Sequence, residues 1–88
     1  MANRLKYVMY EHNGLSYDFI LLPLVMNHNS IQHTQRIKSA GFVQLYSEKD
    51  QYGFENIKAD CFGKSITLNK ESNPEEDSKI ITISLSLD

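Results

Sequence analysis

The dipeptide Asn13-Gly14 separates two stretches of sequence that have the composition of β-strands. Asparagine and glycine both tolerate the positive φ angles of a type I′ turn, which joins two strands in a tight hairpin. A two-residue turn at this point pairs Val8 with Phe19 and Tyr7 with Ile20. Large apolar side chains then lie on both faces of the hairpin. We therefore expect one face to cover a core and the other to contact a partner.

The rest of the chain predicts a single α+β domain over residues 1–88, with a mostly antiparallel sheet, one short helix and the order ββαβββ. Pro23 ends the second strand because proline lacks a backbone donor. The short helix is expected at Ile31–Ser39, with Gly41 as its C-terminal cap. A third strand is expected at Phe42–Ser47. The segments Asn56–Phe62 and Ser65–Leu68 are expected to form either one strand bent at Gly63 or two short strands. A solvated loop at Asn69–Ser78 then leads to a last strand at Ile81–Leu87.

Charge and hydropathy exclude several classes of partner. Nine basic and eleven acidic residues give a net charge of −2, which leaves no excess of positive charge for a DNA backbone. The apolar stretch Phe19–Met26 is interrupted by Pro23 and is too short to cross a membrane. The single cysteine cannot form an internal disulfide, and the charged start of the chain shows no secretory segment. We therefore expect a cytoplasmic protein.

Motifs for catalysis and for metal or cofactor binding are weak. Gly63-Lys64-Ser65 resembles part of a phosphate-binding loop, but the position of the first glycine of that motif is occupied by Lys58. Zinc needs three or four ligands, and only Cys61 and His12 could join the two histidines at positions 28 and 33. We expect no metal and no cofactor.

The sequence also predicts that the protein is not an enzyme. Cys61 alternates with apolar residues in an expected strand, which favours an inert core thiol. The carboxylates of Glu75, Glu76 and Asp77 crowd one expected loop, where they lack the rigid spacing of a catalytic pair. One enzymatic alternative stays open, namely a nuclease or phosphodiesterase that uses the two histidines as acid and base.

Aromatic residues are numerous for so small a core. Tyrosine suits interfaces because one end of the side chain is apolar and the other forms hydrogen bonds. We expect a homo-oligomer, a dimer or larger, whose interface is formed by the hairpin residues Tyr7, Tyr10, Tyr17 and Phe19. The alternative is that most of these rings belong to the core.

Two short blocks carry a resemblance to a known group of proteins. They are Ser39-Ala40-Gly41-Phe42 and Cys61-Phe62-Gly63-Lys64-Ser65, which His28 precedes in the chain. Together they resemble small, mostly uncharacterised proteins encoded by bacteriophages and prophages, over about half of the chain. Some proteins of this kind counter host defence, either by sequestering nucleotide immune signals, as the Thoeris anti-defence sponges do, or by blocking a defence protein.

The resemblance implies a viral accessory protein that acts in the host cytoplasm and sequesters a host nucleotide signal, for example a cyclic nucleotide. It implies a ligand site in which glycines allow close approach, cations bind phosphate, and polar and aromatic side chains hold a base or ribose. The residues expected there are His28, His33, Arg36, Ser39, Gly41, Phe42, Gly63, Lys64 and Ser65. Two alternatives remain: an inhibitor of a host defence complex or a small virion-associated structural protein, with the two blocks serving only as turns.

Overall fold

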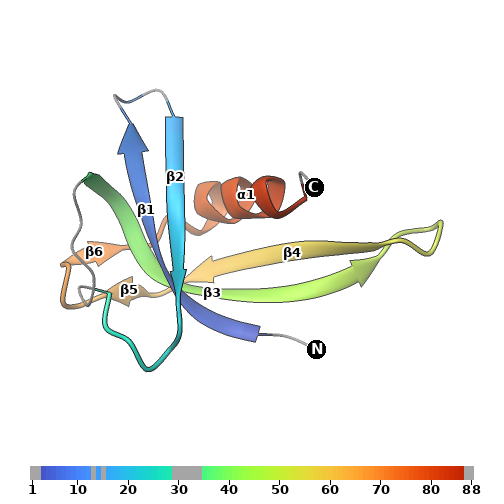
Figure 1. The fold of residues 1–88 in the computed structure, drawn as a ribbon, viewed down its shortest axis with the longest axis horizontal. Coiled ribbons are helices and arrows are strands. Elements are labelled where there is room, and N and C mark those ends of the chain that lie inside the picture. Colours follow the sequence, from blue (N-terminus) through green and yellow to red (C-terminus); the bar gives the residue numbers. More distant parts are fainter. Residues whose placement is uncertain (1–2, 13, 15, 29–34, 87–88) are drawn as a thin grey trace.

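The computed structural model of the chain describes residues 3–12, 14, 16–28 and 35–86. Four strands form an antiparallel sheet in the order β2-β1-β3-β4 (Figure 1). They are β1 (Asn3–His12), β2 (Ser16–Leu22), β3 (Arg36–Lys49) and β4 (Glu55–Phe62). Strands β5 (Lys64–Ser65) and β6 (Lys70–Glu71) form a separate antiparallel ribbon, and helix α1 (Pro74–Leu85) follows it. The α+β class and the mostly antiparallel sheet are confirmed, and the described residues contain one short helix as expected, but this helix follows all the strands.

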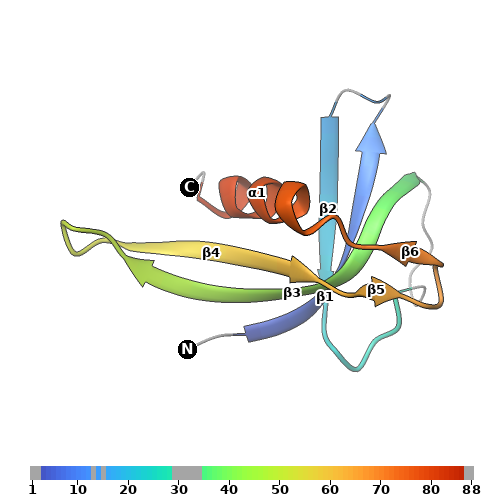
Figure 2. The same cartoon turned by 180° about the vertical axis from the view of Figure 1, so that it is seen from behind.

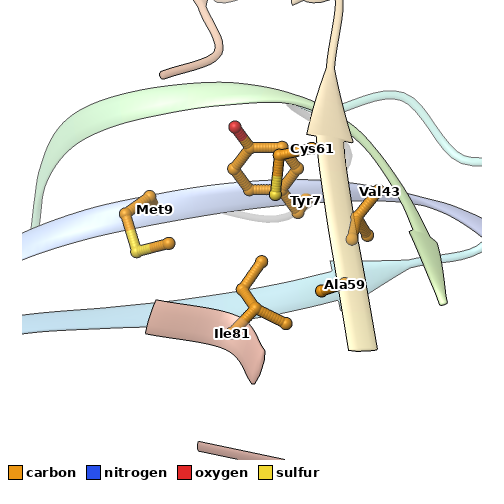
Figure 3. Close-up of a cluster of buried hydrophobic side chains, with 6 residues drawn as sticks. All are labelled: Tyr7, Met9, Val43, Ala59, Cys61 and Ile81. Carbon is orange, nitrogen blue, oxygen red and sulfur yellow. The ribbon is translucent and has the colours of Figure 1, made fainter. Parts of the chain in front are cut away.

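Both faces of the sheet are covered, each by a different part of the chain. On one face, Tyr7, Met9 and Val43 pack with Ile81 of α1, as Figure 3 shows. On the other face, Val8 and Ala40 form a smaller cluster. The turns around Met26 and Leu68 contribute side chains to this second cluster. The alternating apolar side chains of β1 therefore serve two cores, which explains why the hairpin is apolar on both faces.

The hairpin is present, but its predicted register is wrong by one residue. Phe19 pairs with Met9 instead of Val8, because three residues separate His12 from Ser16. A shift of one residue moves a side chain to the opposite face of a sheet. Phe19 therefore packs with the cluster under α1. The end of the second strand is predicted correctly, since β2 stops at Leu22, directly before Pro23.

The helix expected at residues 31–39 is wrong over its second half. Residues 36–39 begin β3, and residues 31–34 lie outside the described part of the chain. Gly41 is not a helix cap. It lies inside β3, opposite Tyr7 of β1, and β3 contains the whole of the strand expected at 42–47. Residues 66–69 form a turn, so that only Ser65 of the strand expected at 65–68 is in a strand.

The strand expected at 81–87 is wrong, since residues 81–85 belong to α1 and residue 87 lies outside the described part of the chain. The loop expected at 69–78 is wrong in part, because it contains β6 and the start of α1. Pro74 occupies the first turn, together with acidic side chains at Glu75, Glu76 and Asp77. Proline has the φ angle of a helix start, and negative charge is favourable at the N-terminus of a helix. Ile81 is fully buried under the sheet, one helical turn after Asp77. The expected solvated loop therefore contains the start of the helix.

Helix α1 also shields part of the outer edge of β4. The Thr82 hydroxyl accepts a hydrogen bond of 3.0 Å from the Ala59 backbone N–H, and the Ser78 hydroxyl accepts one of 2.8 Å from the Cys61 N–H. The free N–H groups of an edge strand attract other strands when they are left unpaired. These two hydroxyls, one helical turn apart, satisfy that edge where the helix crosses it.

Candidate ligand-binding pocket

An open pocket of about 510 Å³ lies between β1, β3 and the start of the β5–β6 ribbon. Most of the surface that lines it is apolar, as in many small-molecule sites. The residues around it are Lys6, Asn27, His28, Phe42, Gly63, Lys64, Ser65, Ile66 and Thr67. The structure thus brings together five of the residues expected to bind ligand, from three separate parts of the sequence: His28, Phe42, Gly63, Lys64 and Ser65.

One wall of the pocket is formed by His28 and Phe42. The His28 side chain is buried, and its Nε2 lies 2.7 Å from the carbonyl oxygen of Gly41, to which it donates a hydrogen bond. Its ring meets the Phe42 ring edge-on, at 5.9 Å between centroids and an angle of 81°. These two contacts hold His28, which follows β2 in the chain, against β3. The edge-on contact of the two rings makes this wall of the pocket aromatic.

Two glycines let the β5–β6 ribbon approach β3 closely. A Cβ atom at Gly41 would lie 2.6 Å from the carbonyl oxygen of Phe62, which is too close for any side chain. Gly63 has a φ of +75°, and a Cβ atom there would lie 3.0 Å from the Phe42 ring. The carbonyl of Gly63 accepts hydrogen bonds from the backbone N–H (3.0 Å) and the hydroxyl (2.7 Å) of Ser72. The glycines thus shape the pocket by close packing of backbone.

Positive charge stands at the rim. Lys64 is exposed in β5, and Lys6 in β1 donates a hydrogen bond of 2.6 Å to the carbonyl of Met26. Lysine has three donors, so this bond leaves the Lys6 ammonium with further capacity. The residues that line the pocket include no carboxylate. An anionic group that entered would therefore meet two lysines and no carboxylate of the lining, although Glu71 of β6 pairs with Lys64 across the ribbon.

An aromatic row continues from the pocket along the sheet. The rings of Phe42 and Phe62 are stacked, with centroids 5.8 Å apart and an angle of 22°. The guanidinium of Arg4 lies over the Phe62 ring, 5.3 Å from its centroid. Lys6, Arg4 and Phe62 are not among the site residues expected from the sequence. The pairing of Lys6 with Phe42 across β1 and β3 is the signal that identifies this face, and it depends on the register.

Other residues expected in the site lie elsewhere or have another role. The hydroxyl of Ser65 is buried, 3.3 Å from the hydroxyl of Thr67 and 3.3 Å from the backbone N–H of Leu68, so it organises the turn. Ser39 lies on the opposite face of the sheet, where its hydroxyl bonds Asp77. Arg36 is exposed at the start of β3, paired with Glu11 near the far end of β1. Gly41 supplies the carbonyl for His28, and residue 33 is outside the described ranges.

The expected interface on the hairpin does not form one exposed surface. Tyr7 is fully buried under α1, and Tyr10 is 8 % exposed in the second core. Phe19 is half-buried against the first core, while Tyr17 is 39 % exposed and lies under the ammonium of Lys38, 5.1 Å from the ring centroid. Tyr7 and Tyr10 are therefore core residues and are not available to a second subunit.

A buried carboxylate lies on the opposite face of the sheet from the pocket. Asp77 accepts hydrogen bonds from the hydroxyls of Tyr7 (2.5 Å) and Ser39 (2.6 Å) and from the ammonium of Lys38 (3.0 Å). Burial alone would raise the pKa of Asp77, but these bonds and the backbone N–H of Asn73 outweigh it and lower the pKa. Burial, followed by the Asp77 interactions, raises the pKa of Tyr7. The Asp77 carboxylate is fully buried, and its hydrogen bonds stabilise the fold.

No three of the histidine, cysteine and acidic side chains that the structure describes come together in a way that could hold a metal ion. Within the described ranges, no helix has the length and apolar character needed to span a membrane. Comparison of the chain with protein families, with curated proteins and with solved structures gave no match.

Proposed function

We propose that this protein binds a nucleotide in the pocket between β1, β3 and the β5–β6 ribbon, and holds it without chemical change. The observation that supports this proposal is the combination of Lys6 and Lys64 at the rim with the aromatic wall of His28 and Phe42. A nucleotide carries the two matching features, a negatively charged phosphate and a flat base.

Each part of the ligand has a partner in this arrangement. The phosphate lies between the two lysine ammonium groups, where no carboxylate of the pocket lining opposes it. The base lies against Phe42, since an aromatic ring gains stacking energy from any base. Gly63 leaves the ribbon backbone uncovered by a side chain beside that ring.

Retention without turnover is the simplest use of these side chains. The Nε2 of His28 already lies within hydrogen-bond distance of the Gly41 carbonyl, so this nitrogen holds the wall in place. A general acid or base would have to reach the reacting group of the ligand with a free ring nitrogen. We therefore assign His28 to the shape of the pocket.

Sequestration of a host signal is the biological role that fits such a protein. The sequence blocks that resemble phage-encoded accessory proteins are those around Gly41 and Gly63, and both contribute to the pocket. A phage protein that holds a nucleotide immune signal in the host cytoplasm would lower its free concentration and so counter defence. Cyclic nucleotides are the first ligands to test.

The experiment is native mass spectrometry of the purified protein with a panel of cyclic and linear nucleotides, followed by titration calorimetry of any that bind. The substitution Lys64→Gln removes a rim charge from an exposed side chain and is expected to weaken binding at least about tenfold. Lys79→Gln is the matched control, because Lys79 is exposed on α1, away from the pocket.

Three results separate the possibilities. An unchanged bound nucleotide whose affinity falls only in Lys64→Gln supports the proposal. A bound nucleotide that is converted to a product would replace retention by catalysis. A protein that stays bare with every nucleotide at micromolar concentration would refute the proposal.

A further inference from the structure

The tip of the β3–β4 hairpin (residues 48–55) is a rigidly built turn. The Asp50 carboxylate accepts hydrogen bonds from the backbone N–H groups of Tyr52 (2.9 Å) and Phe54 (3.0 Å). The backbone of Asp50 exchanges two more bonds, with the N–H of Gly53 (3.1 Å) and the carbonyl of Phe54 (2.9 Å). Gly53 supplies the positive φ, +85°, that the turn requires. The turn is therefore fixed before any partner binds.

This turn presents two large aromatic side chains to solvent. Tyr52 is 75 % exposed and Phe54 is 69 % exposed. Aromatic side chains on a preorganised backbone lose little entropy on binding, and they dominate the energy of many protein interfaces. The hydrogen bonds of the turn use the backbone of these two residues and not their side chains. The tip therefore has the chemistry of an element that inserts into an apolar pocket.

The tip cannot reach the lysine-rimmed pocket of its own chain. Phe42 lines that pocket and Asp50 begins the turn, and the stretch of β3 between them spans about 26 Å at the rise of a β-strand. The hairpin extends away from the β5–β6 ribbon in both views (Figures 1 and 2), along a molecule whose longest dimension is 41 Å. Any contact between tip and pocket must therefore join two molecules.

Charge favours that contact. The tip carries three carboxylates and one lysine, a formal charge of −2, on Glu48, Asp50, Glu55 and Lys49. The pocket lining carries two lysines and no carboxylate, a formal charge of +2. Most of the surface that lines this pocket is also apolar, and Phe42 and the 84 % exposed Ile66 are among its lining residues. Tip and pocket are thus complementary in both charge and apolar character.

We propose that the tip of one molecule inserts Tyr52 and Phe54 into the lysine-rimmed pocket of a second copy of this chain. The contact is head-to-tail, so each molecule uses its tip on one neighbour and its pocket on another. Such contacts propagate into a closed ring or an open chain. A nucleotide in the pocket competes with the tip, but the contact does not require nucleotide binding.

The test is analytical ultracentrifugation of the wild-type protein over a range of concentrations, without any nucleotide. Wild-type mass is expected to rise with concentration. A tip variant, Tyr52→Ala with Phe54→Ala, and a pocket variant, Lys64→Glu with Ile66→Asp, are each expected to stay monomeric. Both pairs of side chains are exposed, and circular dichroism of each variant checks that it is folded.

The decisive experiment mixes the two variants. In a head-to-tail contact, the intact pocket of the tip variant receives the intact tip of the pocket variant, so the mixture forms heterodimers and nothing larger. We expect the heterodimer to form at least about tenfold more tightly than either variant self-associates. Ile83→Ala, at a 60 % exposed position on α1, is the control and is expected to assemble like the wild type.

Several results would overturn the proposal. They are a wild-type protein that stays monomeric at every concentration, a tip variant that still assembles, or a mixture of the two variants that remains monomeric. None of these measurements contains a nucleotide, so a failure of the proposed nucleotide binding leaves them unaffected. If both proposals hold, adding the bound nucleotide to the wild-type protein dissociates the assembly.

Discussion

The phenol of Tyr7 in β1 donates a hydrogen bond of 2.5 Å to the carboxylate of Asp77 in α1, which lies 70 residues further along the chain. The same carboxylate also accepts a bond of 3.0 Å from the backbone N–H of Asn73, the residue before the helix. A carboxylate that is 0 % exposed is tolerated only when donors surround it. Asp77 therefore fixes both the place where α1 begins and its position against the sheet.

Removing the Tyr7 hydroxyl tests this role. Tyr7→Phe keeps the ring in the core and deletes one donor to a buried charge, so the free energy of unfolding is expected to fall by about 1–3 kcal/mol. The measurement is urea denaturation followed by circular dichroism. Tyr17→Phe is the control, because Tyr17 is partly exposed, and its effect is expected to stay within about 0.5 kcal/mol. A loss in Tyr7→Phe no larger than in this control contradicts the assignment.

Acid is expected to destabilise the fold through Asp77. Burial alone would raise the pKa of this group, but the donors around it lower its pKa below the ordinary value of 3.8. A group with a lowered folded-state pKa stabilises the fold above its unfolded value and loses that contribution as the pH falls through the folded value. The free energy of unfolding should therefore decrease as the pH falls below about 4.

The variant Asp77→Asn isolates this contribution. It should be less stable than the wild type at pH 7, because the amide replaces a charge that accepts bonds from Lys38 and three other groups. It should lose less stability than the wild type between pH 5 and pH 3, since it has no proton to take up at this position. Equal pH slopes for the two proteins would count against a lowered Asp77 pKa.

The Cys61 thiol is expected to be unreactive in the folded protein. Burial raises its pKa to about 11, and the side chain is 4 % exposed. Alkylation requires the thiolate, so iodoacetamide at pH 8 should label the native protein at least about 100-fold more slowly than the protein in concentrated urea. Mass spectrometry of a time course gives both rates. Rapid labelling without urea would show that the core opens at α1.

The main sheet was predictable because its signals are local. The Asn13-Gly14 turn, the strand-like composition on both sides of it and Pro23 placed β1 and β2, and the pattern around Phe42 and Cys61 placed parts of β3 and β4. The register of the hairpin was not predictable from Asn13-Gly14. The structure has three residues between His12 and Ser16, and that one extra residue exchanges the two faces of β2.

Helix α1 was missed because its sequence carries two conflicting patterns. Ile81 and Ile83 alternate with polar residues, as in a strand, while Asp77, Ile81 and Leu85 recur at the four-residue spacing of a helix. The start signal, Pro74 followed by acidic residues, was present and favoured the helix. Burial of Ile81 on the sheet and the bonds to Asp77 decide between the patterns, and both are long-range contacts.

The candidate pocket was predictable only in part, for a similar reason. Phe42 and Gly63 belong to the two short sequence blocks that suggested a ligand site, so the sequence alone selects them. Lys6 enters the pocket only through the pairing of β1 with β3. The side chain of Ser39 lies outside the pocket, because alternation along β3 places Ser39 and Phe42 on opposite faces of the sheet. Strand register therefore decides which residues line the pocket, and the sequence specifies that register weakly here.

The hydroxyl groups of Ser78 and Thr82 on α1 accept hydrogen bonds from the outer edge of β4. Thr82→Val keeps the shape of the side chain and removes the acceptor of the Ala59 N–H, so the free energy of unfolding is expected to fall by about 1–2 kcal/mol. Amide hydrogen exchange at Ala59 should accelerate, while exchange in β1 follows only the change in global stability.

Ser84→Ala provides the control, because Ser84 is exposed on the same helix, and its effect on stability is expected to stay within about 0.5 kcal/mol. The double variant Ser78→Ala with Thr82→Val also leaves the Cys61 N–H without its acceptor. Its open edge should then promote association through β4, even when the tip carries Tyr52→Ala and Phe54→Ala. Unchanged exchange at Ala59 in Thr82→Val would mean that packing of α1, and not its hydroxyl groups, protects this edge.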